Sequence, residues 1–356
     1  MIAWYRYHMV TIPVIIFECH FMPTIHDVAK RAGVAPITVS RVINNSGYAS
    51  AETRRRVEEA AAELGYVPNR MASGLRTKRS HSLALVLTDI TNPFFTTVAR
   101  GVEDIANEAG YTVTFSNTDE DAAKEKQYLE LLIQQQVDGI LLVPAHDSTD
   151  NVAYVQAHDT PLVVLDRRLP GAKVDVVRCD SEGGAYQLVR LLVELGHRRI
   201  ALLGGPQGAS TAEDRKTGYR TAMAEAGLSG GITEYCGTFT QSSGYQMAAA
   251  ALALERKPTA LFAANNFIAI GALQALFDNN LSVPEDIALV GFDDLPPALV
   301  TLPFLTVAAQ PAYEMARKGA ELLLSRIDEA EVEIVQEIVL PTELIVRQSS
   351  GLALTR

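Results

Sequence analysis

Polar and aromatic side chains that could bind a small ligand follow apolar segments of the chain. Asn92 and Phe94 come after one such segment, and Asp166 and Arg167 directly follow another. Carboxylates and amides can bind neighbouring hydroxyl groups, and a guanidinium can bind a hydroxyl or a carboxylate. An aromatic ring can cover the C–H face of a sugar, although Phe94 could equally be a core residue. These residue types indicate a carbohydrate-like ligand.

Motifs for catalysis are missing from the sequence. It contains no GxSxG, Walker A, HExxH or GxGxxG pattern. The glycine-rich segment 204–208 could hold a phosphate, but it lacks the lysine of a phosphate-binding loop, so a plain strand-to-helix turn is favoured. His146, His158 and His197 are scattered without a plausible nucleophile partner, and we interpret them as surface or packing residues. We therefore predict that the protein is not an enzyme.

The cysteines predict neither a disulfide framework nor a metal site. Cys19, Cys179 and Cys236 are an odd number with wide spacings, and no CxxC or His/Cys cluster accompanies them. We expect buried thiols in a reducing compartment, and neither a metal nor a cofactor.

The candidate ligand-binding residues depend on an alternation of strands and helices that begins at Ser82. Near-continuous apolar strands in such an alternation are typical of parallel sheets with helices on both faces. The segments are too many for one open sheet, so we expect two doubly wound subdomains with the ligand between them, at the carboxyl ends of the strands. The predicted strands are Leu83–Leu87, Val113–Phe115, Ile140–Val143, Leu162–Leu165, Ile200–Leu203, Ala260–Ala263 and Ile287–Phe292.

The charge of the chain is divided unevenly. The 356 residues carry a net charge of -11, which for the chain as a whole argues against a nucleic-acid partner. Residues 22–81, however, contain 10 Lys and Arg against 5 Asp and Glu, whereas residues 82–356 contain 20 against 36. A basic segment ahead of an acidic body is typical of a nucleic-acid-binding module attached to a domain with another task.

Three short helices are expected in the basic segment. The first covers Thr24–Ala32 and ends at Gly33, and the second covers Pro36–Ile43 with its proline in the first turn. The third begins after Ser50 and ends at Gly65. Two helices joined by a glycine-centred turn predict a helix-turn-helix, whose second helix enters the major groove of DNA.

The order of residues in this segment resembles that of the lactose-repressor (LacI/GalR) family. The matching stretches read TIHDVAKRAGVAPITVSRVIN over Thr24–Asn44, SAETRRRV over Ser50–Val57 and LGYVPN over Leu64–Asn69. The likeness continues through almost all of the remaining chain. The resemblance implies an N-terminal all-α helix-turn-helix domain followed by a periplasmic-binding-protein-like core of two doubly wound α/β subdomains.

The resemblance places three residues of the second helix against base edges. Arg41 could bind a guanine in a bidentate manner, whereas Pro36 and Ile37 could make only apolar contacts. Family members often carry polar residues at the latter two positions, which leaves the operator sequence open. Candidate contacts to phosphate or sugar, each of which could instead be an ordinary cap or surface residue, are Thr24, Thr38, Ser40, Asn44, Tyr48, Ser50 and Thr53.

The segment that follows, residues 68–76, is too short to be a stable helix by itself. In the family this segment is a hinge helix that forms when two copies meet in the minor groove, where a leucine wedges between base pairs. Leu75 occupies that position, and Asn69, Arg70, Ala72 and Arg76 are the other candidate DNA contacts. A linker with a stray leucine is the alternative.

The resemblance also implies ligand-binding roles in the acidic body. Arg215 occupies the effector-contacting arginine position of the family, and Phe239 matches an aromatic platform. Asn265 and Asp293 match polar groups that bind ligand hydroxyls, and Gln310 is a further candidate.

A cluster of arginines leaves open whether the ligand is acidic. Arg167, Arg215 and Arg178, which lies where the chain crosses between the two halves, would suit a sugar acid or a sugar phosphate if all three faced one cleft. The other explanation of the cluster is a set of salt bridges to Asp166, Asp180 and Asp214.

These observations predict a ligand-controlled transcriptional regulator, usually a repressor. Two subunits would bind a pseudo-palindromic operator in double-stranded DNA, and a small carbohydrate-like effector would change the affinity for it. The sign of that change stays open, and the tail after Arg347 has no leucine heptads, so a homodimer is expected. The alternatives are an exported sugar-binding protein and a sugar-modifying enzyme. The basic segment of residues 22–81 argues instead for a regulator in the cytoplasm, associated with the nucleoid and without a membrane partner.

The expected domain boundaries follow from these segments. Residues 1–21 contain only a short apolar run, and we interpret them as an extension upstream of the working start at Met22. A disordered extension or a secretion signal are the alternatives. The helix-turn-helix covers 22–67, the hinge helix and linker 68–81, and the core 82–356. Within the core we expect an N-subdomain of 82–179 plus 309–327 and a C-subdomain of 180–308 plus 328–356.

Overall fold

A computed structural model of the chain describes residues 23–44, 46–67, 79–146, 148–295, 302–328 and 334–351. The chain divides into two compact units between Lys78 and Arg79. The predicted extension (1–21) and the hinge segment (68–76) lie outside the described residues, as do residues 77 and 78 of the linker. Each unit is described by itself.

The first unit is a bundle of three helices, α1 (Ile25–Ala32), α2 (Pro36–Ile43) and α3 (Ala51–Leu64). Gly33 and Gly65 end α1 and α3 with φ angles of 66° and 62°, in the left-handed region that glycine adopts without steric cost. The three helices therefore begin and end as the sequence predicts. Their shared core consists of Val28, Ala29, Ala32, Val39, Val42, Val57 and Ala60.

The second unit contains two six-stranded sheets. In the first sheet the strand order is β11-β5-β4-β3-β1-β2, and in the second it is β12-β10-β9-β8-β6-β7. Without β11 and β12, both sheets have the doubly wound 2-1-3-4-5 order. All pairs are parallel except β10 with β12. The predicted fold class is confirmed: along the chain, an N-terminal helical domain is followed by two doubly wound subdomains.

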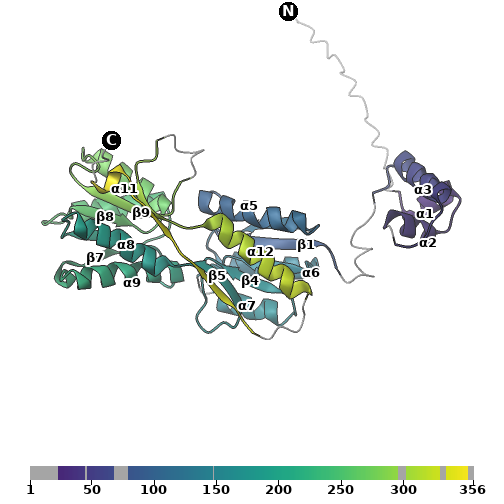
Figure 1. Ribbon diagram of the computed structural model, residues 1–356, viewed down its shortest axis with the longest axis horizontal. Coiled ribbons are helices and arrows are strands. Elements are labelled where there is room, and N and C mark those ends of the chain that lie inside the picture. The colour runs from purple at the N-terminus through teal and green to yellow at the C-terminus, as the bar shows by residue number, and fades with distance from the viewer. Residues whose placement is uncertain are drawn as a thin grey trace, which may run out of the picture. The chain divides into compact units, whose positions relative to one another are not determined.

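The first sheet is covered on both faces. One hydrophobic cluster includes residues of α5 and α12, and a separate cluster includes residues of α6 and α7. Figure 1 shows α5 and α12 side by side on the near face of this subdomain. The strands are β1 (Ser82–Leu87), β2 (Thr112–Asn117), β3 (Gly139–Leu142), β4 (Leu162–Leu165), β5 (Asp175–Cys179) and β11 (Glu337–Leu340), and the helices are α5 (Pro93–Glu108), α6 (Ala122–Gln134), α7 (Thr149–Gln156) and α12 (Ala312–Asp328).

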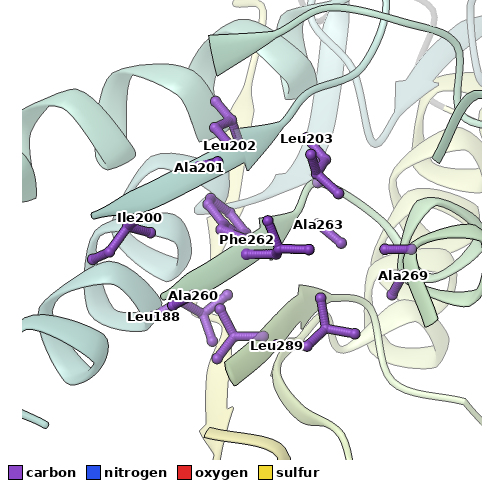
Figure 2. Close-up of a cluster of buried hydrophobic side chains, with 14 of the residues drawn as sticks. Leu188, Ile200, Ala201, Leu202, Leu203, Ala260, Phe262, Ala263, Ala269 and Leu289 are labelled. Carbon is purple, nitrogen blue, oxygen red and sulfur yellow. The ribbon is translucent and has the colours of Figure 1, made fainter. Parts of the chain in front are cut away.

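The second sheet repeats this arrangement around one large hydrophobic core. Figure 2 shows part of it, where Phe262 of β8 lies among side chains of β6, β9 and the neighbouring helices. The strands are β6 (Ile200–Leu203), β7 (Thr233–Tyr235), β8 (Ala260–Ala263), β9 (Ala288–Phe292), β10 (Thr306–Ala309) and β12 (Glu343–Ile345). The helices are α8 (Ser181–Glu194), α9 (Ser210–Glu225), α10 (Gln241–Leu252), α11 (Asn266–Asp278) and the short 3₁₀ turns Ser229–Gly231 and Gln348–Ser350.

One predicted boundary is wrong. Residues 328–356 were expected in the C-subdomain, but β11 pairs with β5 in the first sheet, and only β12 joins the second sheet. Pro341 stands between the two strands, and a proline cannot donate to a ladder of hydrogen bonds. The chain therefore crosses between subdomains at this point, in addition to the crossings after Cys179 and after Ala309.

Candidate functional site

A cleft of about 470 Å³ lies between the two subdomains, at the carboxyl ends of the strands. Its volume falls within the range of small-molecule sites, and an open α/β sheet usually binds its ligand at this edge. Residues from both subdomains line it: Thr88, Asp89, Thr91, Asn92, Phe94, Phe95, Asp119, Glu120, His146, Asp166, Arg167, Pro206, Thr211, Arg215, Thr238, Phe239, Thr240, Asn265, Asp293 and Gln310.

Arg215 is held in place by the second subdomain. Its Nη1 donates a hydrogen bond to the carbonyl oxygen of Ala264 at 2.7 Å, and its guanidinium lies 3.8 Å from the centroid of the Phe292 ring. The Nε atom is buried without a hydrogen-bond partner among the described residues. The side chain is therefore fixed by protein contacts while one donor stays available to a ligand.

Asp166 and Asp293 occupy equivalent places in the two subdomains. Each directly follows the fourth strand of its sheet in chain order, and their φ angles are 66° and 68°. Asp is one of the few residues with a side chain that adopts this left-handed conformation with some frequency. Burial raises the pKa of both carboxyl groups, and raises that of Asp166 to about 6 although Arg167 and Arg215 lower it.

Arg167 is fixed by the first subdomain. Its Nη atoms donate to both carboxylate oxygens of Glu120 at 2.5 and 2.6 Å, and Nη1 also donates to the carbonyl oxygen of Pro144 at 2.9 Å. The guanidinium lies 5.9 Å from the centroid of the Phe239 ring, which belongs to the other subdomain. Most of the charge of Arg167 is thus already compensated inside the protein.

Three amide side chains connect helix ends to the cleft. Asn265 caps α11 by accepting a hydrogen bond from the backbone N–H of Ile268 at 2.9 Å. Asn92 caps α5 by accepting from the backbone N–H of Phe94, and it also accepts from Asn266 Nδ2 at 2.9 Å. The last bond joins the two subdomains. The cap of α11 leaves Asn265 in the wall of the cleft, where its amide N–H groups can still donate.

Five buried polar atoms that belong to the cleft residues have no hydrogen-bond partner in the described part of the chain. They are Thr88 Oγ1, Asp166 Oδ1, Arg167 Nε, Arg215 Nε and Gln310 Oε1. Gln310 uses its Nε2 to donate to Asp293 at 2.6 Å. Buried polar groups are nearly always paired, so a ligand with both donors and acceptors is the natural partner of this set.

Arg178 does not line the cleft. It lies on β5, and its Nε donates to Glu337 of β11 at 2.5 Å. The salt bridge forms because β11 joins the edge of the first sheet, which the sequence did not indicate. The other nine predicted ligand-binding residues all line the cleft. The expected bridge to Asp214 is also different, because Arg168 rather than Arg215 binds this carboxylate.

The cleft includes polar residues that sequence reasoning missed. Asp119 and Glu120 follow β2, and the exposed His146, interpreted above as a surface or packing residue, follows β3 at the rim. Asp119 and Glu120 lie two and three residues after the end of β2, so the rule that selected Asp166, a polar residue directly after a strand, does not find them. The glycine-rich segment 204–208 is the turn between β6 and α9. The ring of Phe239 lies so close to Gly205 that a Cβ at this position would overlap it.

In the first unit the candidate base-reading residues are accessible. Arg41 and Ile37 are exposed on α2, and the exposed fraction of Tyr48 is 92%.

The other candidate DNA contacts differ in their surroundings. Ser50 Oγ accepts a hydrogen bond from the backbone N–H of Thr53, and the Thr24 hydroxyl donates to Asp27, so Ser50, Thr53 and Thr24 contribute to helix caps. Thr38 and Ser40 are half-buried on α2, and Asn44, exposed, is its C-cap. Pro36 is half-buried in its first turn. Asn69, Arg70, Ala72, Leu75 and Arg76 lie outside the described residues.

Neither a metal-binding cluster nor a membrane-spanning helix occurs among the described residues. Within them no group of three or more His, Cys, Asp or Glu side chains could hold a metal ion. None of the helices in the part of the chain that the structure describes is long and apolar enough to cross a membrane.

Each of the two units matches a known protein family or domain. Residues 24–69 match the family described as bacterial regulatory proteins, lacI family, and residues 189–350 match the periplasmic binding protein-like domain. The HTH-type transcriptional regulator DegA of Bacillus subtilis is 38% identical over 334 residues, which cover 92% of this chain and 98% of that protein. The matched regulators are transcription factors, not enzymes.

Solved structures agree with this assignment. A complex of the transcriptional regulator CelR with cellobiose is 35% identical, with a TM-score of 0.69, and covers 92% of this chain and 99% of that one. The lac repressor dimer bound to operator and an anti-inducer is 30% identical, with a TM-score of 0.82, and covers 93% of this chain and 99% of that one.

Proposed function

Because the chain belongs to the LacI family of transcriptional regulators, we propose that it is a repressor whose affinity for operator DNA is controlled by a small effector bound in the cleft. The observation that carries this proposal is the pairing of a basic helix-turn-helix unit with a cleft whose buried polar atoms lack partners within the described residues. The protein would work in the cytoplasm. A homodimer would present two recognition helices to two half-sites. The lac repressor, which is similar to this chain, is likewise a dimer when bound to its operator.

We propose that the effector is an uncharged sugar. Among the described residues that line the cleft, five carry carboxylates and two carry guanidinium groups. Glu120 already binds one of these guanidinium groups, that of Arg167. An acidic sugar would bring a further negative charge next to the carboxylates of the cleft, at a cost that a neutral hydroxyl avoids. This cost disfavours the sugar acid or sugar phosphate considered from the sequence. The absence of Arg178 from the cleft disfavours such a ligand further, because it removes one of the three arginines expected there.

The predicted contacts follow from the unpaired atoms. Hydroxyl groups can donate to Asp166 Oδ1 and Gln310 Oε1 and accept from Arg215 Nε, while Phe239 and Phe94 cover apolar faces of the ring. Carbohydrate recognition by such a set needs no metal or cofactor.

A thermal-shift comparison tests the effector class. The full chain is heated with cellobiose, ribose, ribose 5-phosphate or gluconate. A sugar present at about 100 times its Kd adds about 2.7 kcal/mol to the free energy of unfolding and raises Tm. We expect a neutral sugar to raise Tm and the anionic compounds to have no effect. A larger shift with gluconate or the phosphate would overturn the neutral class.

Arg215→Ala is the matching variant. It should abolish the sugar-dependent change in operator affinity while operator binding itself is kept, because Arg215 lies in the cleft and not in the DNA-binding unit. Arg220→Ala, on the same helix but exposed and paired with Glu234, is the control. A normal sugar isotherm for Arg215→Ala would remove this residue from the site.

A further inference from the structure

Two carboxylates hold the short segment Arg79–His81 at the beginning of the second unit. Asp138 accepts hydrogen bonds from the backbone N–H of Ser80 at 2.7 Å, from the Ser80 hydroxyl at 2.8 Å and from the backbone N–H of His81 at 3.0 Å. This arrangement satisfies three donors with one side chain from a distant part of the sequence. Hydrogen bonds to a carboxylate are stronger than those between neutral groups, so the segment is held firmly.

The second carboxylate lies at the C-terminal end of α12. Arg79 donates from Nη1 to Asp328 at 2.7 Å and from Nη2 to the carbonyl oxygen of Ile327 at 3.0 Å. A cation at a helix C-terminus compensates both the free carbonyl groups and the helix dipole. Arg79 therefore connects the start of the unit to the last turn of α12.

The backbone of His81 shows how far the segment is constrained. Its φ angle is 51°, a conformation that residues other than glycine adopt when surrounding contacts hold them there. Its carbonyl oxygen accepts from the backbone N–H of Thr112 at 3.0 Å, and its ring lies 5.3 Å from that of Tyr111. With the bonds to Asp138, this residue is fixed on both sides.

Both carboxylates belong to elements that reach the cleft. Asp138 directly precedes β3, and beyond the other end of that strand the carbonyl oxygen of Pro144 binds Arg167. Asp328 ends α12, which begins just after the cleft residue Gln310 and spans 17 residues, about 25 Å at the rise of an α-helix. The segment Arg79–His81 is thus attached to two rigid elements whose far ends lie at the cleft.

We propose that Asp138 and Asp328 are positioning residues that fix the chain at the start of the core and thereby set which spacing of operator half-sites the protein accepts. This inference rests on the proposed function, a homodimer on two half-sites. With the segment fixed, the tether to each DNA-binding unit has a defined origin in the dimer. With the segment released, each tether gains length, so spacings that the wild type rejects become accessible.

The experiment measures spacing discrimination by the full chain. A duplex with two half-sites is first selected from a random library with wild-type protein. Kd is then measured for that duplex, for a single half-site, and for versions with about two base pairs added or removed between the half-sites. Such a change in spacing also rotates one half-site around the helix axis relative to the other. The variants are Asp138→Asn, Asp328→Ala and the double variant. The control is Asp150→Asn, an exposed carboxylate on α7 of the same subdomain.

We expect the wild type and Asp150→Asn to bind the altered spacings at least about tenfold more weakly than the selected one. In the double variant this ratio should fall to about threefold or less, while Kd for the single half-site stays unchanged. A double variant that discriminates spacing as the wild type does overturns the inference. An equal loss of affinity for all duplexes in a double variant whose Tm is unchanged also overturns it. A wild type that gains nothing from a second half-site would instead refute the proposed function.

Discussion

Arg41 is the residue on which base reading depends most directly. It is exposed on α2, and a guanidinium can form two hydrogen bonds to a guanine. Arg41→Ala should therefore relax the preference at one position of each half-site by about 1 to 3 kcal/mol. Competition binding against single-base variants of the selected duplex measures this preference.

Arg55→Ala is the control for this prediction, because Arg55 is exposed on α3 and paired with Glu59. It should leave the preference for each base unchanged. If Arg41→Ala instead weakens binding to every duplex equally, the side chain contacts a phosphate.

Asp166 gives a prediction about pH. Its pKa is raised from 3.8 to about 6 by burial, so the folded protein binds a proton there more tightly than the unfolded chain. The stability due to this carboxyl is fully present below about pH 4 and is lost as the pH rises through about 6. Charged Asp166 then destabilises the sugar-free protein by about 3 kcal/mol at pH 7.

Asp166→Asn should therefore raise the free energy of unfolding relative to wild type at pH 7 and have little effect near pH 4. Denaturant unfolding at both pH values, without sugar, measures the difference. The variant should also bind sugar less well, because an amide oxygen accepts a hydrogen bond from a hydroxyl more weakly than the unpaired carboxylate oxygen Oδ1 does. A stability difference that does not depend on pH would contradict the raised pKa.

The positions of the cleft residues could be predicted well where a polar residue directly follows a strand. Asp166 and Asp293 are of this kind, and the geometry of parallel strands brings them to one edge. Arg178 lies within a strand, and its salt-bridge partner Glu337 stands on β11, 159 residues away in the sequence. Such a pairing leaves no local pattern in the sequence.

At the scale of elements, a clasp joins the two subdomains beside the cleft. Arg168, in the loop after β4, binds both carboxylate oxygens of Asp214 on α9 at 2.5 Å, and its backbone N–H donates to Ser210 Oγ at 3.0 Å. Arg215, the next residue after Asp214 in the chain, has no hydrogen-bond partner for its Nε among the described residues. The clasp thus stabilises the arrangement in which both walls of the cleft face a ligand.

Breaking the clasp should weaken sugar binding. Arg168 is 42% exposed, so solvent screens the pair, and we expect Arg168→Ala to cost about 1 kcal/mol, or about a fivefold higher Kd for sugar. Calorimetric titration with the sugar that raises Tm measures this. Exchanging the two charges, Arg168→Asp with Asp214→Arg, should recover part of the loss. If the double variant binds no better than either single one, the pair does not couple.

The elements that could be predicted share a strong local signal. Leu162–Leu165, Ile200–Leu203 and Ala260–Ala263 are buried apolar strands and lie where the sequence predicts them. The seven predicted strands leave out five: β7, β11 and β12 are partly exposed edge strands with polar side chains, whereas β5 and β10 are mostly buried. Edge strands depend on their neighbour for half of their environment, which composition alone does not describe.

At the scale of the whole molecule, the charge of the chain follows its division into units. Residues 22–81 have an excess of 5 basic residues, whereas residues 82–356 have an excess of 16 acidic ones. The core is therefore repelled by the phosphate backbone, and affinity for DNA depends on the small basic unit. This separation disfavours nonspecific adhesion of the core to nucleic acid.

The salt dependence of operator binding follows from this division. If each basic unit neutralises about four or five phosphates, a dimer releases about eight to ten counterions, and log K should fall with log salt with a slope of about -7 to -9. Fluorescence anisotropy of the selected duplex over a series of salt concentrations measures the slope. Tm over the same series serves as the control, because the core must stay folded. A slope near zero would contradict binding through the basic unit, since direct base contacts alone release few ions.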